Sequence, residues 1–131
     1  MFNRIHSSTV VVADKNKAVA FYVDKLGWEV RTDNDLGDGY RFVTVAPAGG
    51  EAELSLEIPQ VTVHEAGGHS GLSLIVDDID TTIATLLERG VAVVGMEGEA
   101  ITAAQDMPWG NRGAWFNDLD GNTHFFVQTA T

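Results

Sequence analysis

The feature that most constrains the fold is an internal repeat whose period is close to half of the 131-residue chain. The segment V-A-D-K-N-K-A, which begins at Val12, can be superposed on V-D-D-I-D-T-T, which begins at Val76, an offset of 64 residues. The glycines that end the following helical patterns, Gly27 and Gly90, are 63 residues apart. Such a period indicates a duplicated supersecondary unit. We therefore expect a single domain of two modules, at about residues 5–58 and 71–129, with a linker at about 59–70.

The first module is predicted to have the order βαβββ. The β-branched run Ser7–Ala13 predicts a strand, and an apolar stripe at helical spacing predicts a helix over Lys15–Lys25. Asp14 is the expected N-cap of this helix, and Gly27 is expected to end it. The remaining segments are predicted as strands at Trp28–Arg31, Tyr40–Ala46 and Ala52–Ile58, with turns at Asp33–Gly39 and Pro47–Gly50.

The second module begins in the same way. Gly71–Val76 predicts a strand, and Ile79, Ile83, Leu86 and Leu87 form the apolar stripe of a helix. The Asp-Gly-Asn sequence in Leu119–Asn122 is typical of a hairpin turn. Further strands are expected at Val91–Val94, Ile101–Ala104, Ala114–Asn117 and Thr123–Thr129, with a loop at Gln105–Gly113.

The composition excludes several classes of function. Lys plus Arg total 8 and Asp plus Glu total 19, so the net charge is −11 and the protein lacks the basic surface that nucleic acids and anionic lipids require. The absence of cysteine excludes disulfides, zinc–thiolate sites, iron–sulfur clusters and thiol nucleophiles. No apolar run has the length of a membrane span or a signal sequence, so the expected location is the cytoplasm.

Four segments carry a resemblance to a known family. They are V-V-V-A-D-K-N-K-A-V-A-F-Y-V-D-K-L-G-W-E-V (Val10–Val30), L-I-V-D-D-I-D (Leu74–Asp80), E-R-G-V (Glu88–Val91) and W-G-N-R-G-A-W-F-N-D-L-D-G-N (Trp109–Asn122). Together they resemble the vicinal-oxygen-chelate superfamily of glyoxalase I, bleomycin resistance proteins and extradiol dioxygenases. The last segment is similar to the family's D-P-D-G-N signature, with Leu119 in place of proline.

The resemblance implies an α+β fold in which two tandem βαβββ modules form a cupped, partly open eight-stranded mixed sheet around a cavity. It also implies a homodimer. In metal-using members four side chains hold a divalent metal, and the corresponding positions here are Ser7, Glu53, Gly71 and Phe125. Because a divalent metal needs several nitrogen or oxygen donors, we expect no metal cofactor. The alternative is that His6, His69 or His124 turns inward and joins Glu53 or Glu57 as a metal ligand.

Aromatic residues occupy segments that line the cavity in relatives. Tyr40, Trp109, Trp115 and Phe125 are therefore expected to contact a planar ligand. Five other aromatic residues are expected to pack in the core: Phe21, Tyr22, Trp28, Phe116 and Phe126.

The remaining polar residues have simpler interpretations. We expect His64 and His69 to be solvated in a loop, with a position at the rim of the cavity as the alternative. His6 and His124 are expected to be hydrogen-bonded rather than catalytic. The aspartates of Asp33–Asp38 and Asp77–Asp80 are explained by turn formation and by helix capping.

These observations support two functions of different classes. The first is a metal-independent protein of the bleomycin-resistance type that sequesters a planar or cationic, antibiotic-like molecule in an aromatic cleft. Its expected contacts are Ser7, Tyr40, Glu53, Trp109, Trp115 and Phe125. The alternative is a metal-dependent glyoxalase-like lyase, isomerase or dioxygenase. A third possibility is metal-free catalysis with Glu53 as the base.

Overall fold

The computed structural model describes residues 1–129 and confirms the α+β class. The chain divides into two compact units, Met1–Gly67 and Gly68 onward, which we call the first and second units. The division falls inside the predicted linker, which contains a 3-10 turn at Pro59–Val61 and the start of the next strand. No helix among the described residues is long and apolar enough to cross a membrane.

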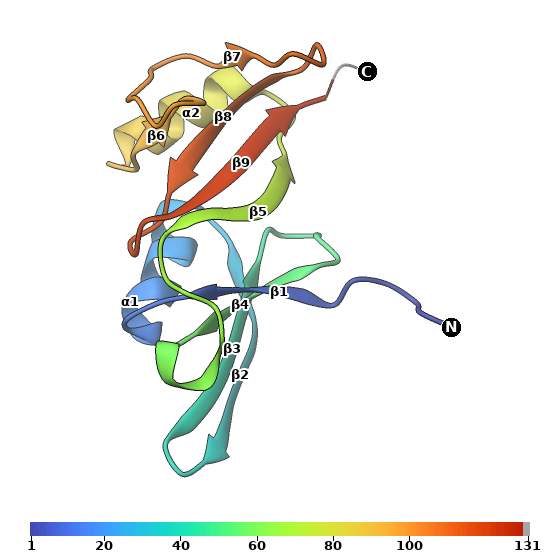
Figure 1. The fold of residues 1–131 in the computed structure, drawn as a ribbon, viewed down its shortest axis with the longest axis vertical. Helices are drawn as coiled ribbons and strands as arrows, with labels where there is room; N and C mark the ends of the chain where they lie inside the picture. The colour runs from blue at the N-terminus through green and yellow to red at the C-terminus, as the bar shows by residue number, and fades with distance from the viewer. Residues whose placement is uncertain (130–131) are drawn as a thin grey trace. The chain divides into compact units, whose positions relative to one another are not determined.

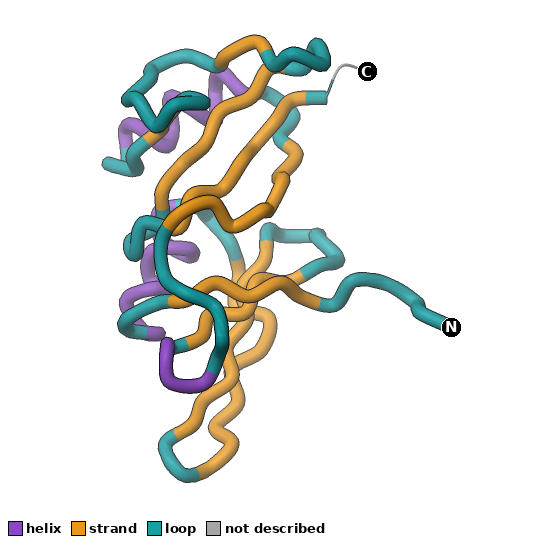
Figure 2. The backbone as a smooth tube through the Cα atoms, viewed as in Figure 1, coloured by secondary structure: helices purple, strands orange, loops and turns teal. Residues whose placement is uncertain are grey.

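The first unit is a four-stranded sheet with one longer helical segment and the 3-10 turn at Pro59–Val61 (Figure 1). Its strand order is β1-β4-β3-β2, with β1 parallel to β4 and the other neighbours antiparallel. The long β2–β3 hairpin is plain in the tube drawing (Figure 2). The strands are β1 (Ser7–Val11), β2 (Glu29–Gly37), β3 (Tyr40–Ala46) and β4 (Glu53–Glu57).

The helical segment differs from the single α-helix that the sequence predicts. It is α-helical over α1 (Lys15–Ala20) and then becomes a π-helix, η1 (Phe21–Lys25). Asp14 is the N-cap, as predicted, and its Oδ1 accepts from the N–H of Lys17 at 3.0 Å. The apolar spacing could not reveal the wider turn, because both helix types present neighbouring apolar residues on one side.

The segment Asp33–Gly39, predicted as a turn, is mostly strand. β2 continues to Gly37, and only Asp38 and Gly39 separate it from β3. Backbone pairing runs from Glu29 opposite Ala46 to Gly37 opposite Tyr40, with two irregularities in register. Pairing with a full-length partner strand therefore outweighs the turn preference of Asp, Asn and Gly.

The second unit is a five-stranded sheet with a helix beside it (Figure 1). The order is β5-β9-β8-β6, and β7 pairs with β8. The predicted strand Ile101–Ala104 is absent. The segment that pairs with β8 is instead Gln105–Asp106, which follows it directly in the chain. The elements are β5 (Gly68–Ile75), α2 (Ile79–Glu88), β6 (Val93–Val94), β7 (Gln105–Asp106), β8 (Arg112–Asn117) and β9 (Asn122–Gln128).

α2 covers one face of the second sheet. Its buried residues are Ile79, Ile83 and Leu86, three members of the predicted stripe. An ion pair ties the helix to β8, since Arg112 donates to both carboxylate oxygens of Asp80 at 3.0 and 3.1 Å. The helix-side core also contains Phe116 and Phe126, which are almost fully buried and whose ring centroids lie 5.8 Å apart. Tyr22 is likewise fully buried in the first unit, whereas Phe21 and Trp28 are partly exposed.

The N-cap of α2 supplies a test of this helix. Asp78 Oδ1 accepts from the N–H of Thr81 at 3.1 Å. Asp78→Ala should lower the free energy of unfolding by about 1 kcal/mol, because one N-terminal N–H loses its partner. Asp78→Asn should lower the free energy of unfolding by no more than a few tenths of 1 kcal/mol, because an amide oxygen can also accept the hydrogen bond at the N-cap. Urea denaturation measures both, and equal losses in the two variants would contradict the capping role.

Candidate functional site

The two faces of the first sheet have opposite chemical character. Residues alternate between the faces along each strand, so the sequence E-L-S-L-E of β4 directs Glu53, Ser55 and Glu57 to one face. Register places Ser7 and Thr9 of β1 and Thr44 of β3 on the same face. We call this the polar face. The other face carries the apolar residues Val10, Val43, Val45, Leu54 and Leu56, all of them buried. On the polar face Thr44, Ser55 and Glu57 are buried as well.

α1 lies against the apolar face. Arg41, which points to that side of β3, donates to Asn16 Oδ1 of α1 at 2.5 Å and to both oxygens of Asp33 at 2.7 and 2.9 Å. The polar face is therefore not needed for the core between the helix and the sheet. Its serine, threonine and glutamate side chains offer hydrogen-bonding groups that such a core would exclude.

The Glu53 side chain on the polar face has a carboxylate but no cationic partner. Its Oε1 accepts from Thr44 Oγ1 at 2.6 Å, and Ser7 is its backbone partner on β1. Within the described chain, no lysine, arginine or histidine nitrogen forms an ion pair with Glu53. The carboxylate is thus available to a cationic group of a ligand.

A second carboxylate, Glu57, is held by a lysine and a tyrosine. Tyr40 donates its hydroxyl to Glu57 Oε1 at 2.7 Å, and Lys15 Nζ lies 3.4 Å from the same oxygen. Lys15 also donates to the carbonyl of Arg41 and lies over the Tyr40 ring, 4.8 Å from its centroid. The hydrogen bond to Glu57, burial and the carboxylate charge raise the pKa of Tyr40, so this hydroxyl remains a donor at neutral pH. Tyr40 is thus already engaged within the protein.

The second unit carries a row of aromatic rings. It runs from His69 of β5 through Trp115 of β8 and Phe125 of β9 to Trp109, with successive ring centroids 6.2, 4.9 and 6.2 Å apart. These spacings are within the range of favourable aromatic contacts. We call these four residues the aromatic row. Sequence analysis identified three of its members and assigned His69 to a solvated loop; His69 is exposed, but its ring also meets Trp115 edge-on.

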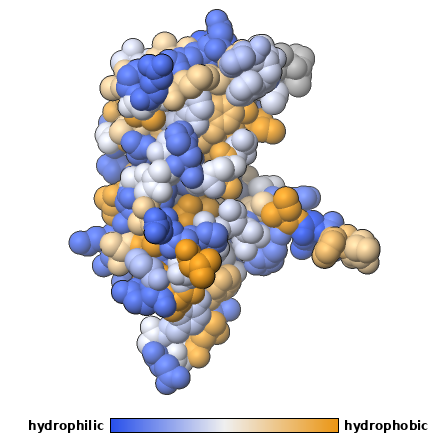
Figure 3. Space-filling view, in the orientation of Figure 1, coloured by the Kyte–Doolittle hydropathy of each residue, from blue (hydrophilic) through white to orange (hydrophobic). Residues whose placement is uncertain are grey.

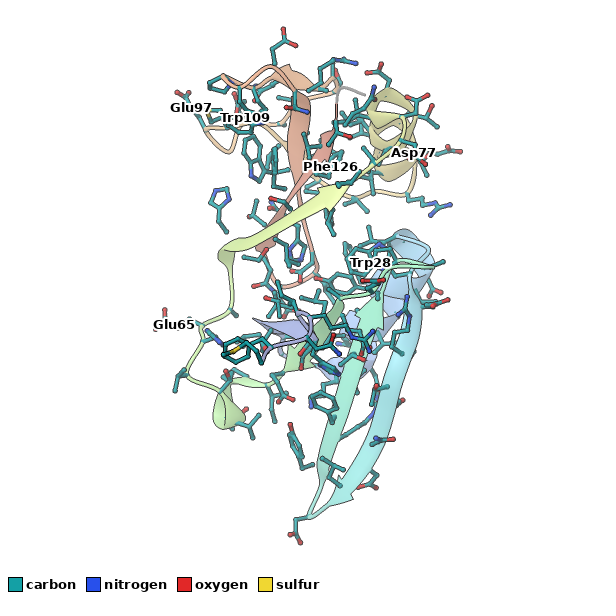
Figure 4. All side chains as sticks on the ribbon, turned by 90° about the vertical axis from the view of Figure 1, so that its right-hand side faces the viewer. Trp28, Glu65, Asp77, Glu97, Trp109 and Phe126 are labelled. Atoms are coloured by element: carbon teal, nitrogen blue, oxygen red, sulfur yellow. The ribbon has the colours of Figure 1, made fainter. Side chains whose placement is uncertain are left out.

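The aromatic row lies on the face of the second sheet opposite α2. Trp115 and Phe125 are backbone partners, whereas their neighbours Phe116 and Phe126 point toward the helix. Figure 4 shows Trp109 and Phe126 on opposite sides of the β8–β9 strands. Trp109 is 62% exposed, and Trp115 and Phe125 are half-buried. The row therefore offers aromatic surface beyond what the core between sheet and helix uses.

A glycine lets the Phe125 ring lie across β8. A Cβ atom added to Gly113 would come within 2.7 Å of Phe125 Cε1 and 2.8 Å of Cζ. Any other residue at position 113 would displace the ring. Gly113 is thus a positioning residue of the aromatic row, one that sequence reasoning missed; its position two residues before Trp115 on the same strand was the available signal.

His124 is buried on the helix side of the second sheet. Its Nδ1 lies 2.7 Å from Ser70 Oγ, and its Nε2 lies 3.9 Å from Asp118 Oδ2. Asp118 in turn accepts from the backbone N–H groups of Asp120 and Asn122, both at 2.9 Å. Burial lowers the pKa of His124 to about 4, and the nearby Asp118 carboxylate offsets part of that shift. The imidazole is therefore neutral at pH 7 and joins β5 to β9.

Only two of the four positions at which the resemblance implies metal ligands carry a side chain with a donor atom. Glu53 offers a carboxylate and Ser7 a hydroxyl, but Gly71 and Phe125 offer no donor. Gly71 lies at an irregularity of β5 with a φ of +83°, and Phe125 is paired with Ser73 instead. Among the described residues, no three His, Asp or Glu side chains are grouped closely enough to hold a metal ion. His6 and His64 are both exposed.

The lowered pKa of His124 predicts a loss of stability in acid. The unfolded chain binds a proton near pH 6.5 and the folded chain only near pH 4, so stability decreases as pH falls from 6.5 toward 4. Once the pH is below the folded-state pKa of His124, this effect lowers the free energy of unfolding by about 3 kcal/mol. Chemical denaturation across this range should show a flatter pH dependence for His124→Gln than for the wild type. Parallel curves for the two proteins would show that His124 is not responsible.

Comparison with known proteins identifies the family and the fold of this chain. A family model described as Glyoxalase/Bleomycin resistance protein/Dioxygenase superfamily matches residues 4–124. A solved member of that superfamily from Sphaerobacter thermophilus DSM 20745 is 41% identical, with 98% of each chain covered and a TM-score of 0.88. TnmS3, an antibiotic binding protein from Streptomyces sp. CB03234, is 34% identical, with 98% of each chain covered and a TM-score of 0.81.

A curated relative matches nearly the whole chain at lower sequence identity. The uncharacterized protein YetH of Bacillus subtilis (strain 168) is 26% identical over 122 residues, which are 93% of this chain and 95% of YetH. The resemblance inferred from four short segments is thereby confirmed over nearly the whole sequence. The chain belongs to the glyoxalase/bleomycin resistance protein/dioxygenase superfamily.

Proposed function

We propose that this protein is a metal-independent binding protein that sequesters a planar or cationic, antibiotic-like small molecule. The observation that carries the proposal is the aromatic row, in which Trp115 and Phe125 are half-buried and Trp109 is largely exposed. Aromatic side chains of this kind hold planar ligands by stacking and by burying apolar area.

Core packing alone does not account for the aromatic row. The helix-facing side of the second sheet is already filled by Phe116, Phe126 and the apolar stripe of α2. The row lies on the other side, and Gly113 leaves space for the Phe125 ring there. Exposed clusters of large aromatic residues on a folded protein are typical of binding surfaces.

The relatives and the charge support the same class of function. TnmS3, described as an antibiotic binding protein, shares 34% of its aligned residues with this chain. The net charge of −11 attracts cationic ligands at long range, and Glu53 keeps an unpaired carboxylate on the polar face of the first unit. Ser7, next to Glu53, is a further proposed contact.

Replacing single rings of the aromatic row should weaken ligand binding. In a thermal-shift screen with planar aromatic and glycopeptide antibiotics, a ligand at one hundred times its Kd stabilises the protein by about 2.7 kcal/mol. For a ligand found in this way, Trp115→Ala and Phe125→Leu should each raise the Kd about tenfold or more.

The control for these variants is Leu119→Ala, which removes an exposed apolar side chain of the same unit at the β8–β9 turn. It should leave the Kd within about twofold of wild type. If the ring variants bind as tightly as this control, the aromatic row is not the binding surface.

Metal binding distinguishes this proposal from the enzyme alternative. A glyoxalase-like lyase, isomerase or dioxygenase of this superfamily requires a stoichiometric divalent metal for its chemistry. We expect metal-stripped protein to show no rise in melting temperature with nickel, zinc, manganese or iron, because the four expected positions include only one carboxylate. Elemental analysis of the purified protein is the second measurement. Stoichiometric metal that Glu53→Gln releases would establish the enzyme alternative instead.

A further inference from the structure

The rings of the aromatic row meet at steep angles rather than lying parallel. The planes of Trp109 and Phe125 are inclined by 71°, with ring centroids 6.2 Å apart, and those of His69 and Trp115 are inclined by 84°. Trp115 and Phe125, in the middle of the row, are tilted by 44°. A planar ligand can therefore stack on only one of two successive rings. The face of the other ring remains for a group of a different shape.

Trp109 and Phe125 form a corner at the surface of the second unit. Phe125 is half-buried against the sheet, whereas Trp109 is 62% exposed. Two backbone hydrogen bonds close the turn that carries Trp109. Met107 N–H donates to the Asn111 carbonyl at 2.7 Å, and Gly110 N–H donates to the Met107 carbonyl at 2.9 Å. The corner is thus preorganised, which lowers the entropic cost of binding a ligand there.

The second unit carries a strong negative charge. Residues 68–129 contain nine Asp and Glu but only two Arg and no Lys, which gives a net charge of −7 with histidine neutral. Both arginines are on the helix side, since Arg112 forms an ion pair with α2 and Arg89 is the C-cap of that helix. Glu97 lies on the same side of the β8–β9 strands as Trp109 (Figure 4). These charges favour a cationic group at the corner over a neutral or anionic one.

Two ring faces at a steep angle fit an alkylated ammonium group. A cation is attracted to the face of an aromatic ring, and most strongly to the face of tryptophan. A trimethylammonium group is nearly spherical, so it can contact both faces of the corner at once, which a flat ring cannot do. A primary ammonium is strongly hydrated and loses more solvation when it enters such a site.

We propose that the corner between Trp109 and Phe125 binds a methylated ammonium group of the ligand, so that the preferred class is a tertiary or quaternary amine. Every residue of this site belongs to the second unit. The inference rests on the proposed function, because it takes the aromatic row as the binding surface. It goes further by assigning the cationic part of the ligand to one pair of rings.

Probes of one shape and different charge test this inference. Choline and 3,3-dimethylbutan-1-ol differ only in the exchange of a quaternary nitrogen for a carbon atom. NMR titrations of the full chain, followed at the tryptophan indole N–H signals, should give a Kd for choline at least about fivefold lower than for the alcohol. Ethanolamine has the same charge on a primary ammonium, and it should bind at least about fivefold more weakly than choline.

Ring substitutions show whether the preference for choline depends on the corner. Trp109→Leu retains an apolar side chain and all charges but removes the ring, so it should reduce the preference over the alcohol to under about twofold. Trp109→Phe should give an intermediate preference, because a phenyl ring attracts a cation less strongly than an indole does. The control Leu119→Ala should leave the preference unchanged. Circular dichroism and melting curves confirm that each variant is folded.

Phosphocholine distinguishes a free amine from a lipid headgroup, since both carry the same trimethylammonium group. The net charge of −7 repels the phosphate, so phosphocholine should bind more weakly than choline. Tighter binding of phosphocholine would contradict the assignment of a cationic ligand.

The outcomes have separate consequences. Equal affinities for choline and the alcohol, or no binding of choline, overturn the inference. A preference that survives in folded Trp109→Leu also overturns it, because the net charge then accounts for the preference without the ring. If the inference fails but Trp115→Ala still weakens a planar antibiotic found by thermal shift, the proposed function stands. If that antibiotic responds to neither Trp115→Ala nor Phe125→Leu while the choline preference depends on Trp109, the proposed function fails and the ammonium site stands.

Discussion

Every strand residue points to one face of its sheet or to the other, and both candidate sites depend on this alternation. In each unit the face toward the helix is mainly apolar and forms the core, with Val43, Val45 and Leu56 in the first unit and Phe126 in the second. The opposite face is therefore free to differ in character. A shift of one residue in any register would exchange core and site residues, so the core and the candidate sites are specified together.

The two units use the same plan for different chemistry. Both place their first and last strands side by side in parallel, which sets Ser7 opposite Glu53 in the first unit and Ser73 opposite Phe125 in the second. The free face of the first unit carries carboxylates and hydroxyls, and that of the second carries aromatic rings. The two units thus share the same backbone pairing, but the faces that point away from their helices differ in chemical character. The surface view shows polar and apolar residues mixed over one side of the protein, with apolar colour at the tip of the N-terminal segment (Figure 3).

Polar groups also stabilise the interior. Lys15, Tyr40 and Glu57 join the start of α1 to the ends of β3 and β4. In the second unit His124 joins β5 to β9 through Ser70 while remaining neutral. These two clusters differ in their protonation chemistry. The first contains a compensated charge pair with one unused acceptor, Oε2 of Glu57, and the second avoids charge on the imidazole because burial opposes protonation.

Local signals in the sequence determined the α+β class, the caps at Asp14 and Asp78, and the helical stripe of α2. Such features depend on residues only a few positions apart, so spacing reveals them. The full length of β2 and the absence of a strand at Ile101–Ala104 were decided by strand pairing. The π-helical end of the first helical segment was likewise not predicted from the apolar spacing. The same holds for the inclusion of His69 in the aromatic row and for the unpartnered oxygen of Glu57. These last features join residues distant in the chain, and their geometry exists only once the strands have paired.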